Sequence, residues 1–216
     1  MRFNAFAEAA ADGGALVAAL FTSAAIFNHS CAPAATWHIA ESSREMIVTA
    51  ARDLAAGEEV TLSYVAPSPA ALLKDAPARW RHISEQWDFL CACELCQQEA
   101  LALMQVGGAP GPLVACLYSL QSGISAAVAH EGAGALGDAA AAWTRVHAAC
   151  AAAPALAGSL HQPACEAALH VAQLSLLQRR GADAAAWVAR ARASDAASGR
   201  PFERWGRLYA VVGAAS

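Results

Sequence analysis

The first third of the chain alternates apolar and polar positions in short runs, as strands with one buried face do. In the clearest run, Met46, Val48 and Ala50 alternate with Glu45 and Thr49. This pattern predicts short extended segments, which we place at residues 37–40, 45–50 and 59–65.

Helical spacing replaces this alternation from residue 78 onward. Trp80, Ile83 and Trp87 recur at i, i+3 and i+7, which predicts a helix over residues 78–87 with these side chains on one face. Residues 101–216 then contain successive Ala-rich helical patterns. Their predicted breaks are 107–112, 132–137, Pro154, Pro163, Gly181 and 198–201. We therefore expect an α+β chain whose last half is all α-helical, as antiparallel hairpins or a TPR-like array.

Composition and charge narrow the class of protein. The 216 residues suffice for one large domain or two small ones. The net charge is −4 with no basic run, so we expect no direct nucleic-acid partner, because phosphate binding requires clustered Lys and Arg. The longest apolar run, residues 15–27, is too short to span a bilayer, so no membrane partner is expected. No targeting signal is recognised, and the seven cysteines, an odd number, favour a reducing intracellular compartment, the cytoplasm or nucleus.

Three cysteines fall within six residues, at Cys91, Cys93 and Cys96. This C-x-C-x2-C spacing is typical of a metal knuckle and poor material for a helix or strand. A structural zinc ion takes four thiolate or imidazole ligands in a tetrahedron, so one position stays open. The best candidate for it is Cys31, in a loop predicted over residues 28–35. The alternatives are ordinary buried cysteines, or a disulfide pair with a spare thiol.

Several short motifs follow one another in an order that resembles a known family. They are Asn4-Ala5-Phe6, Asn28-His29-Ser30-Cys31 followed by Pro33, Gly57-Glu58-Glu59-Val60, Ser63-Tyr64, and Phe89 followed by the cysteine knuckle. Together they resemble the C-terminal half of a SET domain with its cysteine-rich post-SET segment, as in the SET-and-MYND (SMYD) group of protein-lysine methyltransferases. The resemblance covers about residues 1–100, and the helical tail is similar in kind to the C-terminal domain of that group.

The resemblance implies a division of the chain and two binding sites. Residues 1–66 would form the C-terminal half of a SET β-fold, residues 67–100 a linker helix with the post-SET zinc knuckle, and residues 101–216 the helical domain. S-adenosylmethionine would be bound by Asn4, Asn28, His29, Tyr64 and Phe89, with Asn28 and His29 acting largely through backbone groups. One structural Zn²⁺ would be held by Cys31, Cys91, Cys93 and Cys96. Without Cys31 and the later cysteines, Asn28-His29 would be interpreted as a turn with a capping side chain.

The same resemblance implies a lysine channel lined by Phe6, Tyr64 and Trp87, with Tyr64 as the catalytic residue. Methyl transfer from a sulfonium is an in-line displacement, so a phenol at the transfer point can orient the neutral amine. The sulfonium charge also favours loss of a proton from a neighbouring lysine ammonium. Trp87 is a departure, because family members commonly have Tyr there, and its larger ring could narrow the channel or alter how many methyl groups fit. Taken alone, Tyr64 and Trp87 would be interpreted as core residues.

The first functional hypothesis is therefore an S-adenosylmethionine-dependent protein-lysine N-methyltransferase that acts on a histone tail or another lysine-containing protein. The family's Gly-rich cofactor-gripping element and its MYND finger have no counterpart in the sequence. We therefore expect a fragment, a truncated gene product or a chain that has lost catalysis. The second hypothesis is a non-catalytic, zinc-stabilised interaction module whose helical tail is the working surface.

Overall fold

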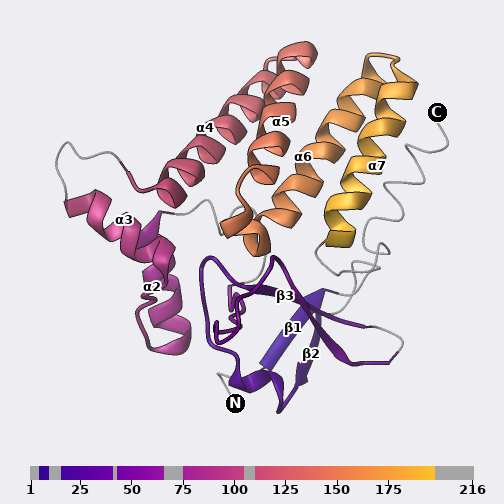
Figure 1. The fold of residues 1–216 in the computed structure, drawn as a ribbon. Helices are drawn as coiled ribbons and strands as arrows, with labels where there is room; N and C mark the ends of the chain where they lie inside the picture. The colour runs from indigo at the N-terminus through magenta and orange to yellow at the C-terminus, as the bar shows by residue number, and fades with distance from the viewer. Residues whose placement is uncertain (1–4, 10–15, 41–42, 66–74, 105–109, 198–216) are drawn as a thin grey trace.

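A strand-rich part and a stack of long helices make up the molecule (Figure 1). The structure, a computed structural model, describes residues 5–9, 16–40, 43–65, 75–104 and 110–197. Strands and helices occur in one chain, so the predicted α+β class is confirmed.

Two antiparallel strand pairs form the first part of the fold. β3 (Ala35–Ile39) pairs with β4 (Met46–Ala50), and these strands correspond to the segments predicted at 37–40 and 45–50. β1 (Ala5–Ala9) pairs with β2 (Leu16–Leu20) and was not predicted. The β1–β2 sequences are almost wholly apolar and Ala-rich, so they lack the alternation on which the strand prediction depends.

The third predicted strand, residues 59–65, is reduced to a single parallel bridge between Leu62 and His29. Leu62 N–H donates to the carbonyl of Asn28, and Ser30 N–H donates to the carbonyl of Leu62, each at 2.9 Å. A longer ladder would next use the N–H of Tyr64. That group instead donates to Nδ1 of the His29 ring at 3.0 Å. The pairing therefore ends where a side chain takes the backbone donor.

Two helices carry the chain from the strands to the helical stack. α2 (Ala76–Trp87) lies close to the predicted 78–87 and begins where the Asp75 carboxylate accepts the N–H of Ala78 at 2.9 Å. α3 (Glu94–Met104) was not predicted, and it includes Cys96. The expectation that the cysteine knuckle is poor material for a helix is thus wrong for its last cysteine, because the turn that contains Cys91 and Cys93 leads directly into α3. Short 3₁₀ turns also occur at Ala24–Ile26 and Pro154–Leu156.

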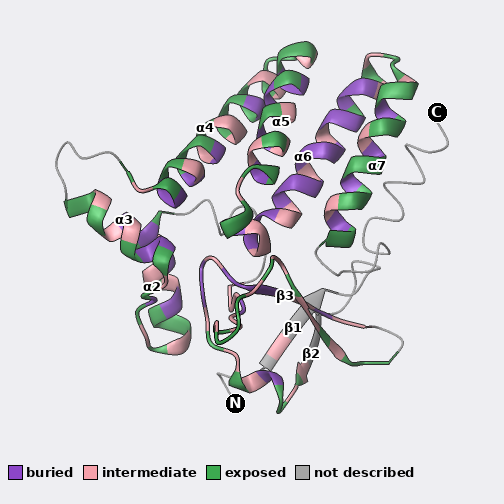
Figure 2. Ribbon diagram, in the orientation of Figure 1, coloured by how far each residue is buried: buried purple, intermediate pink, exposed green. Residues whose placement is uncertain are grey.

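The second half consists of α4 (Pro112–Gly132), α5 (Leu136–Ala151), α6 (Ala157–Leu177) and α7 (Gly181–Ala197). Each helix packs against the next in sequence (Figure 1), as antiparallel hairpins do. Pro163, a predicted break, lies inside α6. A proline there removes one helix hydrogen bond. α6 is packed between α5 and α7 and is extensively buried (Figure 2), and this packing offsets the loss.

One apolar core joins the two halves of the described chain. Its buried members include Cys31 and Leu95 beside the knuckle and Leu117, Trp143 and Leu160 in the helical stack. The cysteines therefore share packing with helices α4 to α6, and a second buried cluster joins α6 to α7.

Helix α4 is the one helix in the described part of the chain with the length and composition to cross a membrane. The core helix of a globular protein passes the same test. α4 packs along α5 and contributes Val114, Leu117 and Leu120 to the core, so the observation is weak evidence for a membrane segment.

The first turn of α6 docks directly on the loop that contains Cys31. A Cβ atom added at Gly158 would lie 2.5 Å from the carbonyl oxygen of Pro33 and 3.2 Å from Cβ of Ala51. The hydroxyl of Ser159 donates to the carbonyl oxygen of Cys31 at 3.0 Å. Only glycine permits this close approach of helix and loop.

We predict that Gly158→Ala lowers the free energy of unfolding by about 1–3 kcal/mol, because the added methyl group meets a backbone carbonyl that must move. Urea denaturation of the metal-loaded chain measures this. Gly137→Ala in α5 is the matched control: its added Cβ has no neighbour within 4 Å, so it should be neutral or slightly stabilising. Equal stability of the two variants would contradict the close docking.

Candidate metal centre and adjoining aromatic pocket

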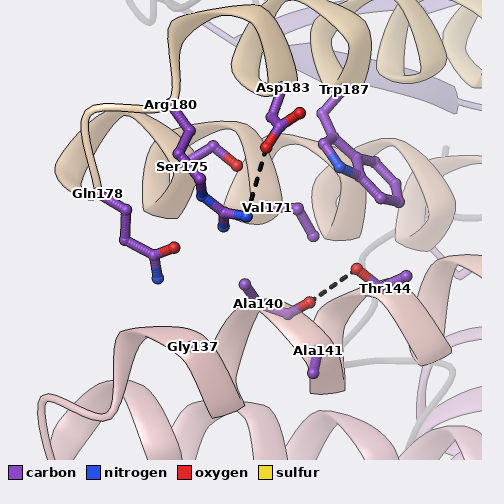
Figure 3. Close-up of a pocket in the computed structure, with 10 residues that line it drawn as sticks. All are labelled: Gly137, Ala140, Ala141, Thr144, Val171, Ser175, Gln178, Arg180, Asp183 and Trp187. Atoms are coloured by element: carbon purple, nitrogen blue, oxygen red, sulfur yellow. Dashed lines mark hydrogen bonds and ion pairs between the residues drawn. The ribbon is translucent and has the colours of Figure 1, made fainter.

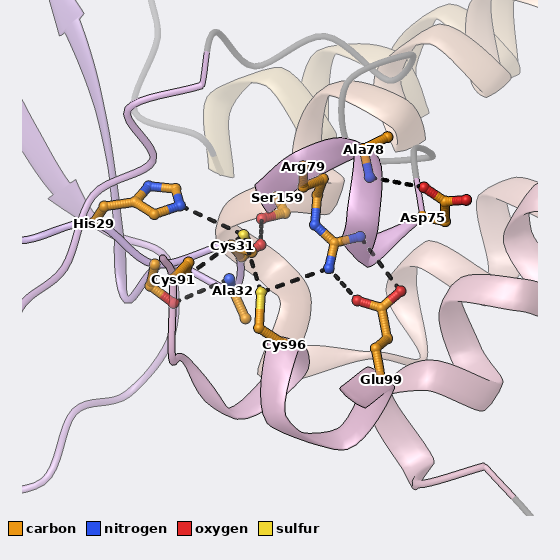
Figure 4. Close-up of polar contacts among 11 residues, drawn as sticks. His29, Cys31, Ala32, Asp75, Ala78, Arg79, Cys91, Cys96, Glu99 and Ser159 are labelled. Atoms are coloured by element: carbon orange, nitrogen blue, oxygen red, sulfur yellow. Dashed lines mark hydrogen bonds and ion pairs between the residues drawn. The ribbon is translucent and has the colours of Figure 1, made fainter. Parts of the chain in front are cut away.

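Four cysteines from two distant stretches of the chain meet at one point. The Sγ atoms of Cys31, Cys91, Cys93 and Cys96 all lie within 4.8 Å of one another. Sγ of Cys31 is 3.9 Å from that of Cys91 and 3.6 Å from that of Cys96 (Figure 4). The proposed meeting of residue 31 with the later knuckle, 60 residues away, is therefore present in the structure.

The geometry and chemistry of the cluster fit a closed zinc site. Tetrahedral zinc with Zn–S bonds of about 2.3 Å requires sulfur atoms roughly 3.8 Å apart. The Sγ–Sγ separations from Cys31 to Cys91 and to Cys96, 3.9 and 3.6 Å, lie on either side of that value. They are far longer than a disulfide bond of about 2.05 Å, and all four cysteines are free thiols. The donor set is four sulfurs, the set that structural zinc prefers.

Hydrogen bonds between the thiols raise the pKa of some of the cysteines and lower the pKa of others. The hydrogen bond with Cys91 raises the pKa of Cys31, and the same contact lowers the pKa of Cys91. The hydrogen bond with Cys31 lowers the pKa of Cys93 to about 6. The thiolate is the form that ligates metal, and the lowered pKa values of Cys91 and Cys93 favour that form.

Arg79 and Glu99 form a buried ion pair beside the cluster, and sequence reasoning did not identify either residue. Their side chains are 3% and 1% exposed. Nη2 of Arg79 also lies 3.8 Å from Sγ of Cys96. Burial would lower the pKa of Arg79, but the bond to Glu99 and the nearby Cys31 raise it, so the guanidinium is charged. One feature of the sequence could have indicated Arg79. It is a charged residue four positions before Ile83, on the apolar face of the predicted helix.

The ring of His29 connects the cluster to Tyr64. Nδ1 accepts the backbone N–H of Tyr64 at 3.0 Å, so in the neutral ring the proton sits on Nε2. Nε2 lies 3.4 Å from Sγ of Cys31 and donates toward the sulfur. Such outer hydrogen bonds orient metal ligands. One imidazole thus joins a metal ligand to the backbone of the proposed catalytic residue.

A pocket of about 380 Å³ adjoins the cluster and collects most of the residues assigned to the cofactor and channel. It is lined by Asn28, His29, Tyr64, Trp87, Phe89, Leu90, Cys91 and Ala92. The ring centroid of Tyr64 lies 5.6 Å from that of Trp87 and 6.2 Å from that of Phe89. Four aromatic or imidazole rings therefore surround one opening beside the metal ligands.

Two residues assigned to this site are placed differently or not described. Phe6 packs edge-on against Phe21 and Trp37, at centroid distances of 6.1 and 5.2 Å, and does not line the pocket described above. Its role in a channel stays a prediction. Asn4 lies outside the described residues.

The backbone N–H and carbonyl groups of His29 point away from Leu62, the residue with which its neighbours pair. Asn28 and Ser30 use their carbonyl and N–H groups to pair with Leu62. In an extended segment successive residues direct these groups to opposite edges, so those of His29 face the other edge. This arrangement is compatible with the expected backbone contacts to a ligand.

The phenol of Tyr64 is held in place by the backbone. Its hydroxyl donates to the carbonyl oxygen of Phe27 at 2.6 Å. Burial, and then the nearby Glu59 carboxylate, raise the pKa of Tyr64. The phenol is therefore protonated at neutral pH, and its oxygen can still accept a hydrogen bond. Glu59 itself accepts from Nδ2 of Asn28 at 2.6 Å.

A second pocket, of about 320 Å³, lies in the helical stack between α5, α6 and α7 (Figure 3). An Ala140–Ala141 floor faces Trp187, and Arg180 pairs with Asp183 at 3.3 Å on its rim. No residue assigned from the sequence lines this pocket, and nothing in it identifies a ligand.

Comparisons with known proteins agree with the geometry of the strand-rich part. A SET domain family model matches residues 5–65. The histone-lysine N-methyltransferase SET5 of Meyerozyma guilliermondii is 39% identical over 83 residues, which are 38% of this chain and 16% of that protein. The SET domain-containing protein SmydA-8, isoform B, of Drosophila melanogaster is 38% identical over 82 residues, 38% of this chain and 17% of that protein. The SET5 protein of Eremothecium gossypii is 35% identical over 72 residues, 33% of this chain and 13% of that protein.

The matches concern the strand-rich part of the chain. Residues 5–65 match the SET domain, and 33% to 38% of the chain is similar to proteins named SET5 and SmydA-8. The matched stretch spans less than a fifth of the length of these curated relatives.

We predict that the purified chain binds about one equivalent of zinc and that Cys31→Ser loses it, because a closed tetrahedral site tolerates no missing thiolate. Elemental analysis after gel filtration measures the stoichiometry. Cys116→Ser is the control, since Cys116 is a half-buried thiol of α4 outside the cluster. Full zinc content in Cys31→Ser would mean that the fourth ligand lies elsewhere.

Proposed function

We propose that this chain contributes the lysine-binding and methyl-donor-binding surface of a protein-lysine N-methyltransferase that uses S-adenosylmethionine and carries one structural zinc ion. The observation that carries the proposal is the single pocket that unites Asn28, His29, Tyr64, Trp87 and Phe89 directly beside the four-cysteine cluster. The SET-domain match over residues 5–65 supports it independently.

S-adenosylmethionine supplies a methyl group activated by a sulfonium charge. The chain supplies a pocket whose aromatic rings favour a cationic ligand, since ring faces attract positive charge. The hydroxyl group of Tyr64 donates its proton to the hydrogen bond with the carbonyl oxygen of Phe27, so the phenol oxygen remains free to accept a hydrogen bond. That oxygen can accept an N–H of the substrate amine and hold its lone pair in line with the methyl carbon. With its raised pKa, Tyr64 is an orienting group and not the base.

Trp87, the last residue of helix α2, forms one wall of the pocket, with its ring centroid 5.6 Å from that of Tyr64. Its bicyclic ring occupies the position where the family resemblance leads us to expect a tyrosine. We infer that it narrows the lysine channel and limits the number of methyl groups that a lysine can carry there. Two of the relatives are named histone-lysine methyltransferases, so histone tails are the first substrates to test, and an intracellular location in cytoplasm or nucleus follows from that substrate class.

A second function is favoured by the size of the helical part. The matched stretch covers only 38% of the chain, and helices α4 to α7 form a stack that extends well beyond it. A non-catalytic, zinc-stabilised interaction module with this stack as its binding surface would use the same metal centre. The two functions differ in whether the aromatic pocket binds the methyl donor.

Calorimetry of the zinc-loaded chain with S-adenosylmethionine and with its demethylated product separates the two functions. The transferase function predicts saturable binding that is lost when the zinc is removed, because His29 links the pocket to Cys31. Absence of binding by the zinc-loaded chain would exclude catalysis by this chain alone and leave the interaction module.

We predict that Tyr64→Phe retains methyl-donor binding but lowers methyl transfer to a histone-tail peptide by on the order of 10²-fold, the effect expected when the reacting amine is no longer correctly positioned. Mass spectrometry of the peptide measures transfer. Tyr118→Phe, at an exposed tyrosine of α4, is the control and should match the unmodified chain. Full transfer by Tyr64→Phe would remove Tyr64 from the reaction.

A further inference from the structure

Helix α2 directs a buried cation at the thiol cluster. Arg79 is held between the carboxylate of Glu99 and the sulfur of Cys96, and Figure 4 shows its guanidinium reaching both. Nη1 lies 3.4 Å from Oε1 of Glu99, Nη2 bonds to Oε2, and the same Nη2 lies 3.8 Å from Sγ of Cys96. Arg79 and Cys96 come from different helices, so this contact also joins α2 to α3.

Electrostatics explain why a cation belongs at this point. A zinc ion with four thiolates carries a net charge of −2, and a buried charge is expensive unless it is paired or hydrogen-bonded. Cys31, Cys91 and Cys96 are 5%, 6% and 1% exposed, so water supplies little of the compensation. An N–H donor from a charged guanidinium supplies it directly, and charge-assisted hydrogen bonds are the strong ones.

Glu99 explains how the guanidinium is aimed. It lies three residues after Cys96 on α3, and residues at this spacing share one helix face. The guanidinium is planar, and a two-point contact with a carboxylate fixes its plane. With that plane fixed, Nη2 stays directed at the sulfur. A lysine could carry the charge but not this orientation.

We propose that Arg79 is a positioning residue of the metal centre: its guanidinium, oriented by Glu99, donates a charge-assisted N–H···S hydrogen bond to the metal-bound thiolate of Cys96 and so strengthens metal retention. The inference rests on the zinc site of the proposed function. It adds that a residue of α2 supports this site by a hydrogen bond to one of the metal ligands. The same helix ends at Trp87, so the bond also ties the aromatic wall of the pocket to the metal.

The test uses the whole chain of 216 residues loaded with Co²⁺, which reports on thiolate ligands through its sulfur-to-metal charge-transfer absorption. Arg79→Met should weaken metal affinity by roughly 10–100-fold, the usual effect of losing an outer hydrogen bond. It should also move the charge-transfer band to longer wavelength, because a sulfur without its hydrogen bond gives up electron density more readily. Arg79→Lys should fall between Arg79→Met and the unmodified chain on both readouts.

A second variant separates this role from ordinary stabilisation. Arg79→Met alone leaves Glu99 buried without its partner, which destabilises any fold. The double variant Arg79→Met, Glu99→Met replaces the whole pair by apolar side chains and should recover the stability of the metal-free chain. Our inference predicts that it still shows the weaker affinity and the shifted band.

Unmodified metal affinity together with an unshifted band in the double variant would overturn the role of Arg79. Absence of stoichiometric Co²⁺ in the unmodified chain would overturn the metal site and this inference together. Failure of the transferase function would give a different result. The chain would then not bind the methyl donor, but the charge-transfer band would still shift when Arg79 is replaced.

Discussion

The structure depends on one long-range contact, the approach of the Cys31 sulfur to three sulfurs that follow 60 to 65 residues later. A zinc ion at this point would close a long loop that includes β3, β4 and α2. Structural zinc contributes about 10–16 kcal/mol of apparent folding free energy in small peptides, and that energy is available only when all ligands are brought together.

The contacts around the cluster extend its influence in three directions. Through its ring, His29 joins Cys31 to the backbone of Tyr64 and so to the pocket. Ser159 joins the same loop to the first turn of α6 and so to the helical stack. Arg79 joins Cys96 to α2, which ends at the aromatic wall. The metal centre, pocket and helical tail are thus adjacent parts of one packed unit, as their shared core also indicates.

Periodicity in the sequence predicted those elements whose pattern is local. β3, β4 and α2 have clear alternation or helical spacing, and the structure contains them within a few residues of the predicted bounds. β1 and β2 could not be recognised, because a strand of alanine and other apolar residues has no polar face to mark its period. Residues 59–65 have the alternation of a strand but form only an isolated bridge at Leu62 and one backbone hydrogen bond from Ala35 to Thr61, and the ring of His29 takes the backbone donor of Tyr64.

The sequence predicted some residues of the candidate site and did not predict others. The spacing of Cys91, Cys93 and Cys96 indicated a metal knuckle, whereas Cys31 was one of several single cysteines and was chosen with the help of its loop context. Arg79 and Glu99 meet between the successive helices α2 and α3, and Ser159 meets the Cys31 loop from α6, so these contacts depend on how the elements pack and are not encoded by a local pattern. Their contacts with the cysteines and with each other are evident only in the three-dimensional structure.

The most direct test of this account is X-ray absorption spectroscopy at the zinc edge of the purified chain. Four sulfur neighbours at about 2.3 Å around one zinc ion would agree with ligation by Cys31, Cys91, Cys93 and Cys96. A first shell with fewer sulfurs, completed by nitrogen or oxygen, would contradict it, because one of the four thiols would then lie outside the metal centre.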